Sequence, residues 1–199
     1  MLPHGASWRR RVIYRMGKGK EPEPAKLFMS LITPEEGTLQ KGVDELRQIF
    51  GEVDFISDVL PFDFTDYYAQ EMGNDLFRRF ITFVSLVSRT LLPEIKRRTN
   101  HLEEQYSTPM GHRKINIDPG YLCLEHVILA TTKGYTHRPY LGEGIYADLT
   151  LIYRNKSYQP LEWTYPDYRQ SELIGLFNQF RKTYQEDLKR RLDHLCLNP

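Results

Sequence analysis

The sequence has little of several features that would assign it to a specialised class of protein. Its 199 residues include two cysteines, Cys123 and Cys196, too few for a disulfide framework and without a paired-cysteine metal spacing. No apolar run approaches the roughly 18 residues that a membrane span needs. No apolar segment of signal-peptide length follows the basic amino terminus. We therefore expect a reduced, cytoplasmic protein with no membrane partner.

A strong charge of either sign is also lacking, because the formal net charge is +1. The chain as a whole therefore does not favour nucleic acid as a partner. The distribution is uneven, since residues 1–25 hold six Lys and Arg residues, two Glu residues and several Gly and Pro residues without a period. We expect residues 1–25 to be a flexible basic tail, with a nucleic-acid-binding arm as the alternative. A single, slightly acidic α+β domain should cover residues 26–195.

The best-known catalytic and nucleotide-binding motifs are absent. No GxxxxGK[ST] phosphate loop occurs, and no GxGxxG follows a strand and opens a helix. HExxH, HxH and GxSxG are missing as well. These absences exclude a P-loop nucleotidase, a dinucleotide-binding domain, a zinc hydrolase of the HExxH type and a serine hydrolase with a nucleophile elbow.

Hydrophobic periodicity defines the fold class that the sequence predicts. Apolar patterns predict strands at residues 26–33, 53–60, 77–87 and 114–117, and helices at about 39–50 and 90–106. The order β-α-β-β-α-β is typical of a ferredoxin-like core, in which helices cover one face of an antiparallel sheet. Additional antiparallel strands are expected near residues 125–132, 145–153 and 158–163, followed by a C-terminal helix.

The strand that reaches Asp118 carries the first candidate site residues. Side chains alternate along a strand, so Asn116 and Asp118 share a face opposite the apolar Ile117. Pro119 and Gly120 should force a turn directly after Asp118. The amide and the carboxylate are then placed to bind a metal, a hydroxyl group or a base. The alternative is that Asp118 only caps its own Asp-Pro-Gly turn.

A cationic, glycine-rich segment follows. Lys133, His137 and Arg138 lie within six residues, and together they are suited to an anion such as phosphate or carboxylate. Gly142 and Gly144 would allow the backbone to approach a ligand closely. Surface charges that serve solubility alone are the alternative interpretation.

Tyr146, Asp148 and Thr150 share one face of the next predicted strand. Neighbouring strands would bring Asp148 near Asp118, where the two carboxylates could bind a divalent cation or separate their pKa values.

Three other segments invite a functional reading. Residues 63–73, which include Glu71, are too polar for a core and too aromatic for a simple connector, so they suggest a lid or binding loop. Asp167 precedes the last helix, where it would complement the helix dipole. On the helix expected at 90–106, Asn100 and Glu103 read as solvated surface.

These motifs together resemble a known family. The segments are KINIDPGYL (114–122), residues 127–153 from VILATTKGYTHR to DLTLIY, WTYPDYR (163–169), FTDYYAQEMG (64–73) and IKRRTNHLE (95–103). They are similar to a bacterial family catalogued as domain of unknown function 4416, over roughly residues 25–190. The resemblance implies a small bacterial cytosolic protein. Members are sometimes labelled GTP-binding, but residues 155–158 read Asn-Lys-Ser-Tyr and break the Asn-Lys-x-Asp guanine motif at its fourth position.

Our hypothesis from the sequence is that the protein binds or processes an anionic, phosphate-bearing small molecule such as a nucleotide. Lys133, His137 and Arg138 would hold the anion, and Asn116 and Glu71 would orient the ligand.

Asp118 and Asp148 would bind a divalent cation or act as acid and base. If the protein is an enzyme, phosphate-ester hydrolysis or phosphoryl transfer fits best, with His137 as proton carrier. The alternative is an RNA- or protein-binding module with no catalytic activity, which would present aromatic residues on an open sheet face.

Overall fold

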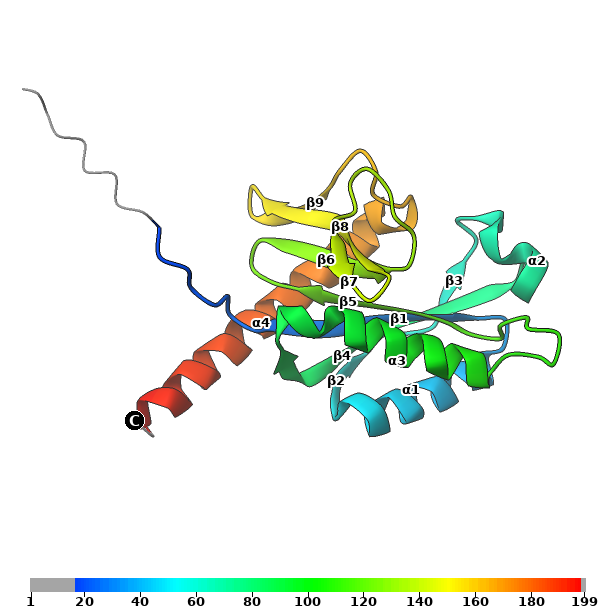
Figure 1. Ribbon diagram of the computed structural model, residues 1–199, viewed down its shortest axis with the longest axis horizontal. Coiled ribbons are helices and arrows are strands. Elements are labelled where there is room, and N and C mark those ends of the chain that lie inside the picture. The colour runs from blue at the N-terminus through cyan, green and yellow to red at the C-terminus, as the bar shows by residue number, and fades with distance from the viewer. Residues whose placement is uncertain (1–16, 198–199) are drawn as a thin grey trace, which may run out of the picture.

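The computed structural model describes residues 17–197 as a curved antiparallel sheet with helices on both faces (Figure 1). The strands are β1 (Ala25–Thr33), β2 (Val53–Ile56), β3 (Leu60–Phe62), β4 (Leu76–Val87), β5 (Asn116–Leu122), β6 (His126–Thr131), β7 (Tyr140–Gly142), β8 (Ile145–Arg154) and β9 (Ser157–Pro160). The helices are α1 (Glu36–Phe50), α2 (Ala69–Met72), α3 (Leu92–Gln105) and α4 (Ser171–Leu197), with short 3-10 turns η1 (Asp66–Tyr68), η2 (Arg89–Leu91) and η3 (Asp167–Arg169). The strand order is β2-β4-β1-β5-β6-β8-β7, with β3 added to β4 and β9 to β8.

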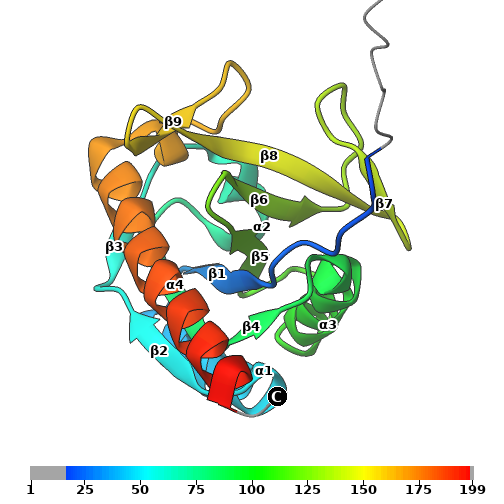
Figure 2. The same cartoon turned by 90° about the vertical axis from the view of Figure 1, so that its left-hand side faces the viewer.

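Strand β1 is the centre of the fold, and all nine of its residues are buried. Leu27, Met29 and Leu31 pack on the face that α1 and α3 cover. Phe28 points to the opposite face, where its ring meets Phe177 of α4 at 5.0 Å. Figure 2 shows α4 on one side of the sheet and α1 and α3 on the other. The strict alternation of the strand therefore supplies two separate apolar cores.

A buried ion pair attaches α4 to the sheet. The Lys26 side chain is fully buried, and its ammonium contacts the carboxylates of Asp54 on β2 and Asp187 on α4. A buried charge is tolerated only when it is paired in this way. The pairing fixes the distal half of α4 against β1 and β2.

The α+β class, the additional antiparallel strands and the C-terminal helix agree with the sequence prediction. The strand predicted at 53–60 is in fact two strands, β2 and β3, and Pro61 lies inside β3, where it pairs with Phe77. Residues 17–24 have no regular secondary structure, and residues 1–16 of the expected tail lie outside the described residues. Within residues 17–197, no helix has the length and apolar character for a membrane crossing.

The turn predicted after Asp118 is wrong, because β5 continues through Pro119 and Gly120 as a strand. β5 pairs with β1 from Asn116 to Leu122, but it pairs with β6 only from Gly120 to Leu122. Pro119 has no N–H to offer a neighbouring strand. The sheet therefore forks between β5 and β6 at Pro119.

Gly120 marks the point at which the fork closes, and it has no room for a side chain. A Cβ there would lie 2.5 Å from the carbonyl oxygen of Ile128 and 2.6 Å from the ring of Phe28. We predict that Gly120→Ala lowers the free energy of unfolding by about 1–3 kcal/mol, as overpacking does. Urea denaturation measures the change.

The control is Gly175→Ala in α4, where a Cβ would meet nothing within 4 Å. Alanine there should stabilise the helix by up to about 1 kcal/mol. Equal stability of the Gly120→Ala variant and the wild type would contradict the tight closure of the fork.

Candidate functional site

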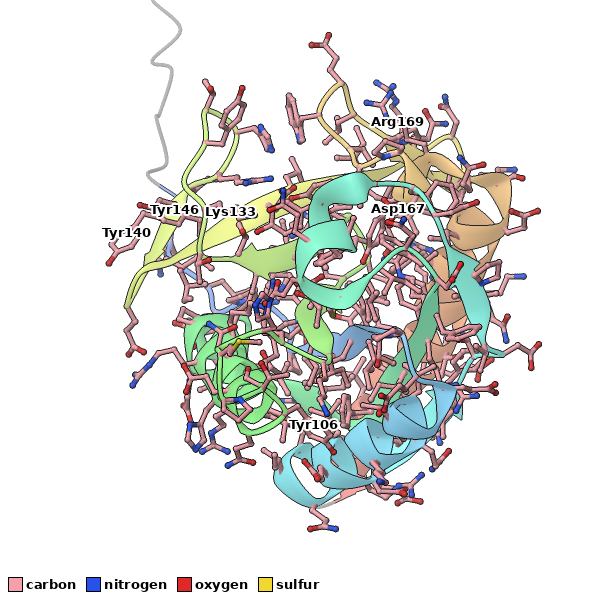
Figure 3. All side chains as sticks on the ribbon, turned by 90° about the vertical axis from the view of Figure 1, so that its right-hand side faces the viewer. Tyr106, Lys133, Tyr140, Tyr146, Asp167 and Arg169 are labelled. Carbon is pink, nitrogen blue, oxygen red and sulfur yellow. The ribbon has the colours of Figure 1, made fainter. Side chains whose placement is uncertain are left out.

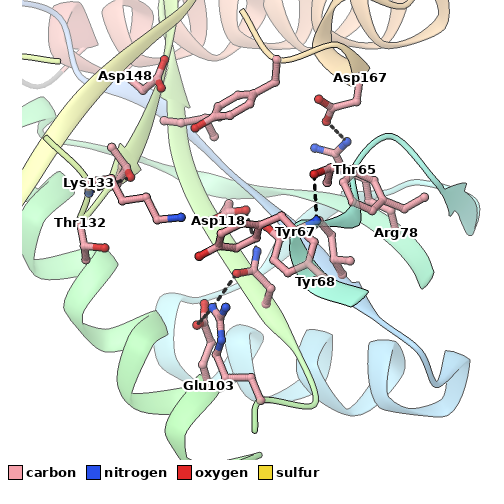
Figure 4. A pocket seen from close by; sticks show the side chains of 18 of the residues that line it. Thr65, Tyr67, Tyr68, Arg78, Glu103, Asp118, Thr132, Lys133, Asp148 and Asp167 are labelled. Atoms are coloured by element: carbon pink, nitrogen blue, oxygen red, sulfur yellow. Dashed lines mark hydrogen bonds and ion pairs between the residues drawn. The ribbon is translucent and has the colours of Figure 1, made fainter. Parts of the chain in front are cut away.

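The fork between β5 and β6 opens into a cleft of about 520 Å³ (Figure 4). Strand β5 lines it with Asn116 and Asp118, and strand β6 lines it with residues 129–131. Helix α3, the β3–η1 segment, η3 and Asp148 of β8 complete the wall. This volume is within the range of small-molecule sites.

Two side chains of α3 replace the missing neighbour of β5. The N–H of Ile117 donates to Oε1 of Glu103 at 2.8 Å, and the ammonium of Lys96 donates to the Ile117 carbonyl at 2.8 Å. Both α3 residues are buried, at 4% and 6% exposure. Backbone groups left unpaired in the interior are costly, so these two bonds allow the sheet to stay open.

Glu103 is also the centre of a charge network at the floor of the cleft. Arg113 donates to Glu103 at 3.0 Å, to Asn116 at 2.9 Å and, through two nitrogens, to Glu71 at 2.8 Å each. Asn116 in turn donates to Asp118 at 2.7 Å. Burial raises the pKa of Glu103, which Lys96 opposes, whereas the hydrogen bond from Arg113 lowers the pKa of Glu71.

Asp148 lies on the β8 side of the cleft with a side chain only 2% exposed. Its Oδ2 accepts a 2.8 Å hydrogen bond from Nε of Arg138, and Nε2 of His137 is 3.7 Å away. Its Oδ1 is buried and receives no hydrogen bond from the described residues. A carboxylate oxygen in that position is an acceptor without a donor, which is rare in the interior of proteins.

The wall near η3 contains a second buried ion pair. Arg78 contacts Asp167, donates from Nε to the Ser30 hydroxyl, and lies over the rings of Phe80 and Tyr168 at 4.4 and 4.9 Å. Asp167 therefore neutralises a buried arginine, in addition to its position before α4. The hydroxyl of Tyr168 is buried and has no partner among the described residues.

Lys133 and Tyr67 form the rim of the cleft. The ammonium of Lys133 lies 3.8 Å from the centre of the Tyr67 ring, and Figure 4 shows the side chain extending across the opening toward it. Within the described side chains, Lys133 has no carboxylate within ion-pair distance. Phe64, Thr65 and Tyr68 of the same segment also line the cleft. A lid role for this segment stays a prediction.

The structure brings four of the predicted site residues together, namely Asn116, Asp118, Lys133 and Asp148, which all line the cleft. His137 and Arg138 lie one layer behind, against Asp148, and the His137 ring stacks on Trp163 with centres 4.9 Å apart. Arg138 also donates to the Tyr165 hydroxyl at 2.6 Å. Arg138 is thus held by protein partners, and Glu71 serves to hold Arg113.

Gly142, Gly144 and Tyr146 lie apart from the cleft lining, in and after the β7–β8 hairpin. The two glycines adopt positive φ angles of 110° and 77°, as a tight hairpin turn needs. Tyr146 packs against Tyr140, with ring centres 5.2 Å apart, and Figure 3 shows this pair at the margin of the sheet.

Asp118 and Asp148 occupy the same cleft but different parts of it. Asp148 pairs with Leu129, and Leu129 pairs with Gly120, so two strand spacings of together about 10 Å separate Asp148 from Gly120, and Asp118 lies two residues further along β5. A cation shared by the two carboxylates stays a prediction from the sequence. Each is better placed to accept hydrogen bonds from a different part of one ligand.

Sequence reasoning missed several charged residues that build the wall, among them Lys96, Glu103 and Arg78. Lys96 and Glu103 follow Leu92 at helical spacing, so the stripe could have been recognised as partly buried rather than as solvated surface. Arg78 shares one face of β4 with the buried Leu76 and Phe80, which also predicts an inward side chain. In each case the spacing indicates a buried position, but the charge of the side chain favoured an exposed one.

The pairing of Glu71 with Arg113 predicts a dependence of stability on pH. The pKa of Glu71 is lower in the folded protein than its ordinary 4.5. Glu71 therefore stabilises the fold above this pH, and the contribution is lost as the pH falls through the lowered pKa. We predict that Glu71→Gln reduces the free energy of unfolding at about pH 7 but much less at about pH 3.

Urea denaturation of both chains at the two pH values measures the difference. The control is Glu186→Gln, an exposed residue of α4. A pH dependence for Glu71→Gln no larger than that of this control would contradict the assignment.

Comparison with known proteins gives the family of the chain. No curated protein and no solved structure was found to match it. The model of one protein family, described as domain of unknown function (DUF4416), matches residues 23–184. This match includes β1 through the first half of α4 and every cleft-lining residue named above. The chain belongs to the DUF4416 family.

Proposed function

We propose that the protein binds a phosphorylated, donor-rich small molecule, such as a nucleotide, in the cleft between β5 and β6. The observation that carries this proposal is Asp148, a residue of the cleft wall whose buried Oδ1 receives no hydrogen bond from the described residues. A hydroxyl or amino group of a ligand would supply the missing donor.

The balance of charge favours a ligand with two kinds of polar group. The lining includes five carboxylates and four cations, and Arg78, Lys96 and Arg113 are each paired with a carboxylate. An isolated anion would therefore meet little free positive charge. A molecule whose hydroxyl or amino groups reach Asp118 and Asp148, and whose phosphate reaches Lys133, satisfies both ends of the cleft.

The aromatic rim supports a ligand that also has a flat apolar part. Phe64, Tyr67 and Tyr165 line the opening, and each is exposed by about two fifths or more. Base–aromatic stacking contributes about 1–3 kcal/mol per base. A nucleobase at the rim would gain this contribution.

The fold itself supports this choice over the RNA-binding alternative. We propose that β1, α1, β2, β4, α3 and β5 form a ferredoxin-like core within a single domain over residues 26–195, which the order β2-β4-β1-β5 supports. RNA-binding sheets of this type present aromatic side chains on an open face. Here α4 packs on one face and α1 and α3 pack on the other.

A thermal-shift screen tests the proposal. The full chain is heated with adenosine and guanosine mono- and triphosphates, sugar phosphates and orthophosphate, each with and without Mg²⁺. A ligand at about a hundred times its dissociation constant should add roughly 2.7 kcal/mol to the free energy of unfolding. We expect a nucleotide or sugar phosphate to do so, and orthophosphate alone to give a much smaller shift.

Two substitutions and a control locate the binding. Lys133→Met and Asp118→Asn should each abolish most of the shift, because one removes the cation at the rim and the other a carboxylate of the cleft. Lys41→Met, at an exposed position on α1, should leave the shift intact. A shift that survives in both cleft variants, or the absence of a shift from every compound, would exclude the proposal.

A further inference from the structure

The turn between β5 and β6 holds a cluster of metal-ligating side chains outside the cleft. Cys123, Glu125 and His126 lie within four residues, and one ligand atom from each lies within 4.8 Å of those from the other two. It is the one such cluster among the described residues. We propose that this turn is a binding site for a thiophilic divalent cation such as Zn²⁺, independent of the ligand in the cleft.

The backbone of the turn is fixed before any cation binds. The N–H of Cys123 donates to the His126 carbonyl at 3.0 Å, and the N–H of Tyr153 donates to the Glu125 carbonyl at 2.7 Å. The Tyr158 hydroxyl donates to the Cys123 carbonyl at 2.6 Å. Three ligands on one rigid turn lose little conformational freedom on binding, which favours affinity.

The donor set and its exposure suit zinc. Thiolate, imidazole and carboxylate are its usual protein ligands, and tetrahedral zinc holds such atoms roughly 3.5 Å apart, so small side-chain rotations suffice. Cys123 is buried, His126 is half-buried and the Glu125 side chain is 65% exposed. A cation can therefore approach from the solvent side, and water or another molecule would complete a three-residue site.

Arg89 is the outer residue of this cluster. Its guanidinium is 3.8 Å from Oε2 of Glu125, and its Nε donates to the Glu23 carbonyl at 3.1 Å. A contact of this length is longer than a hydrogen bond, so Arg89 orients the carboxylate without blocking a cation. Such outer partners typically contribute about 10–100-fold to metal affinity.

Cobalt titration of the untagged full chain tests the site. We expect one equivalent of Co²⁺ to bind with a thiolate-to-cobalt charge-transfer band, and one equivalent of Zn²⁺ to displace it. The band should be lost in Cys123→Ala. Glu125→Gln and His126→Gln should each weaken binding at least about tenfold, since even outer residues contribute that much.

Matched controls separate this site from other ligands of the chain. Cys196→Ser removes the other cysteine, and His101→Gln removes an exposed histidine of α3. Both should bind Co²⁺ like the wild type. The absence of a thiolate band, a band that persists in Cys123→Ala, or an affinity unchanged by both Glu125→Gln and His126→Gln would overturn the proposal. A melting temperature for each variant shows that it is folded.

Discussion

The two hydrogen bonds between Ile117 and the side chains of Glu103 and Lys96 are the interaction on which the cleft depends. A strand that separates from its neighbour leaves backbone groups that need partners, and burying them unpaired would cost stability. Helix α3 provides these partners from its own buried side chains. Because α3 supplies these partners, β5 can remain paired with β1 beyond the fork while β6 pairs with β8 alone. The space between β5 and β6 therefore stays open.

The use of α3 side chains as partners for the β5 backbone also determines the electrostatics of the cleft. A glutamate and a lysine at the buried side of a helix need further partners, and Arg113 and Asp118 supply them. Arg113 is in turn held by Glu71. Among the described side chains, Lys96 and Arg113 are paired in this network and Arg78 is paired with Asp167. The groups left for a ligand are therefore chiefly acceptors, together with Lys133 at the rim. The chemistry of the expected ligand follows from these remaining acceptors and from Lys133.

Periodicity in the sequence predicted the order of the main strands and helices, because β1 and β4 carry apolar residues on both faces and α3 has one buried stripe. It also placed Asn116 and Asp118 on one face of β5. It did not predict β3, β7 and α2 as separate elements. The fork was not predictable, since Pro119 and Gly120 read as a turn when the pairing of β5 with β1 is unknown. The roles of Arg138 and Glu71 depended on contacts over 10 and 42 residues, which a single sequence does not reveal.

The most direct test of the account is a crystal structure of the full chain grown with the nucleotide or sugar phosphate that gives the largest thermal shift. The account predicts density for the ligand between β5 and β6, with a donor group within hydrogen-bond distance of Oδ1 of Asp148 and the phosphate at Lys133. Density for the ligand at another surface, with Oδ1 of Asp148 still without a donor, would contradict it.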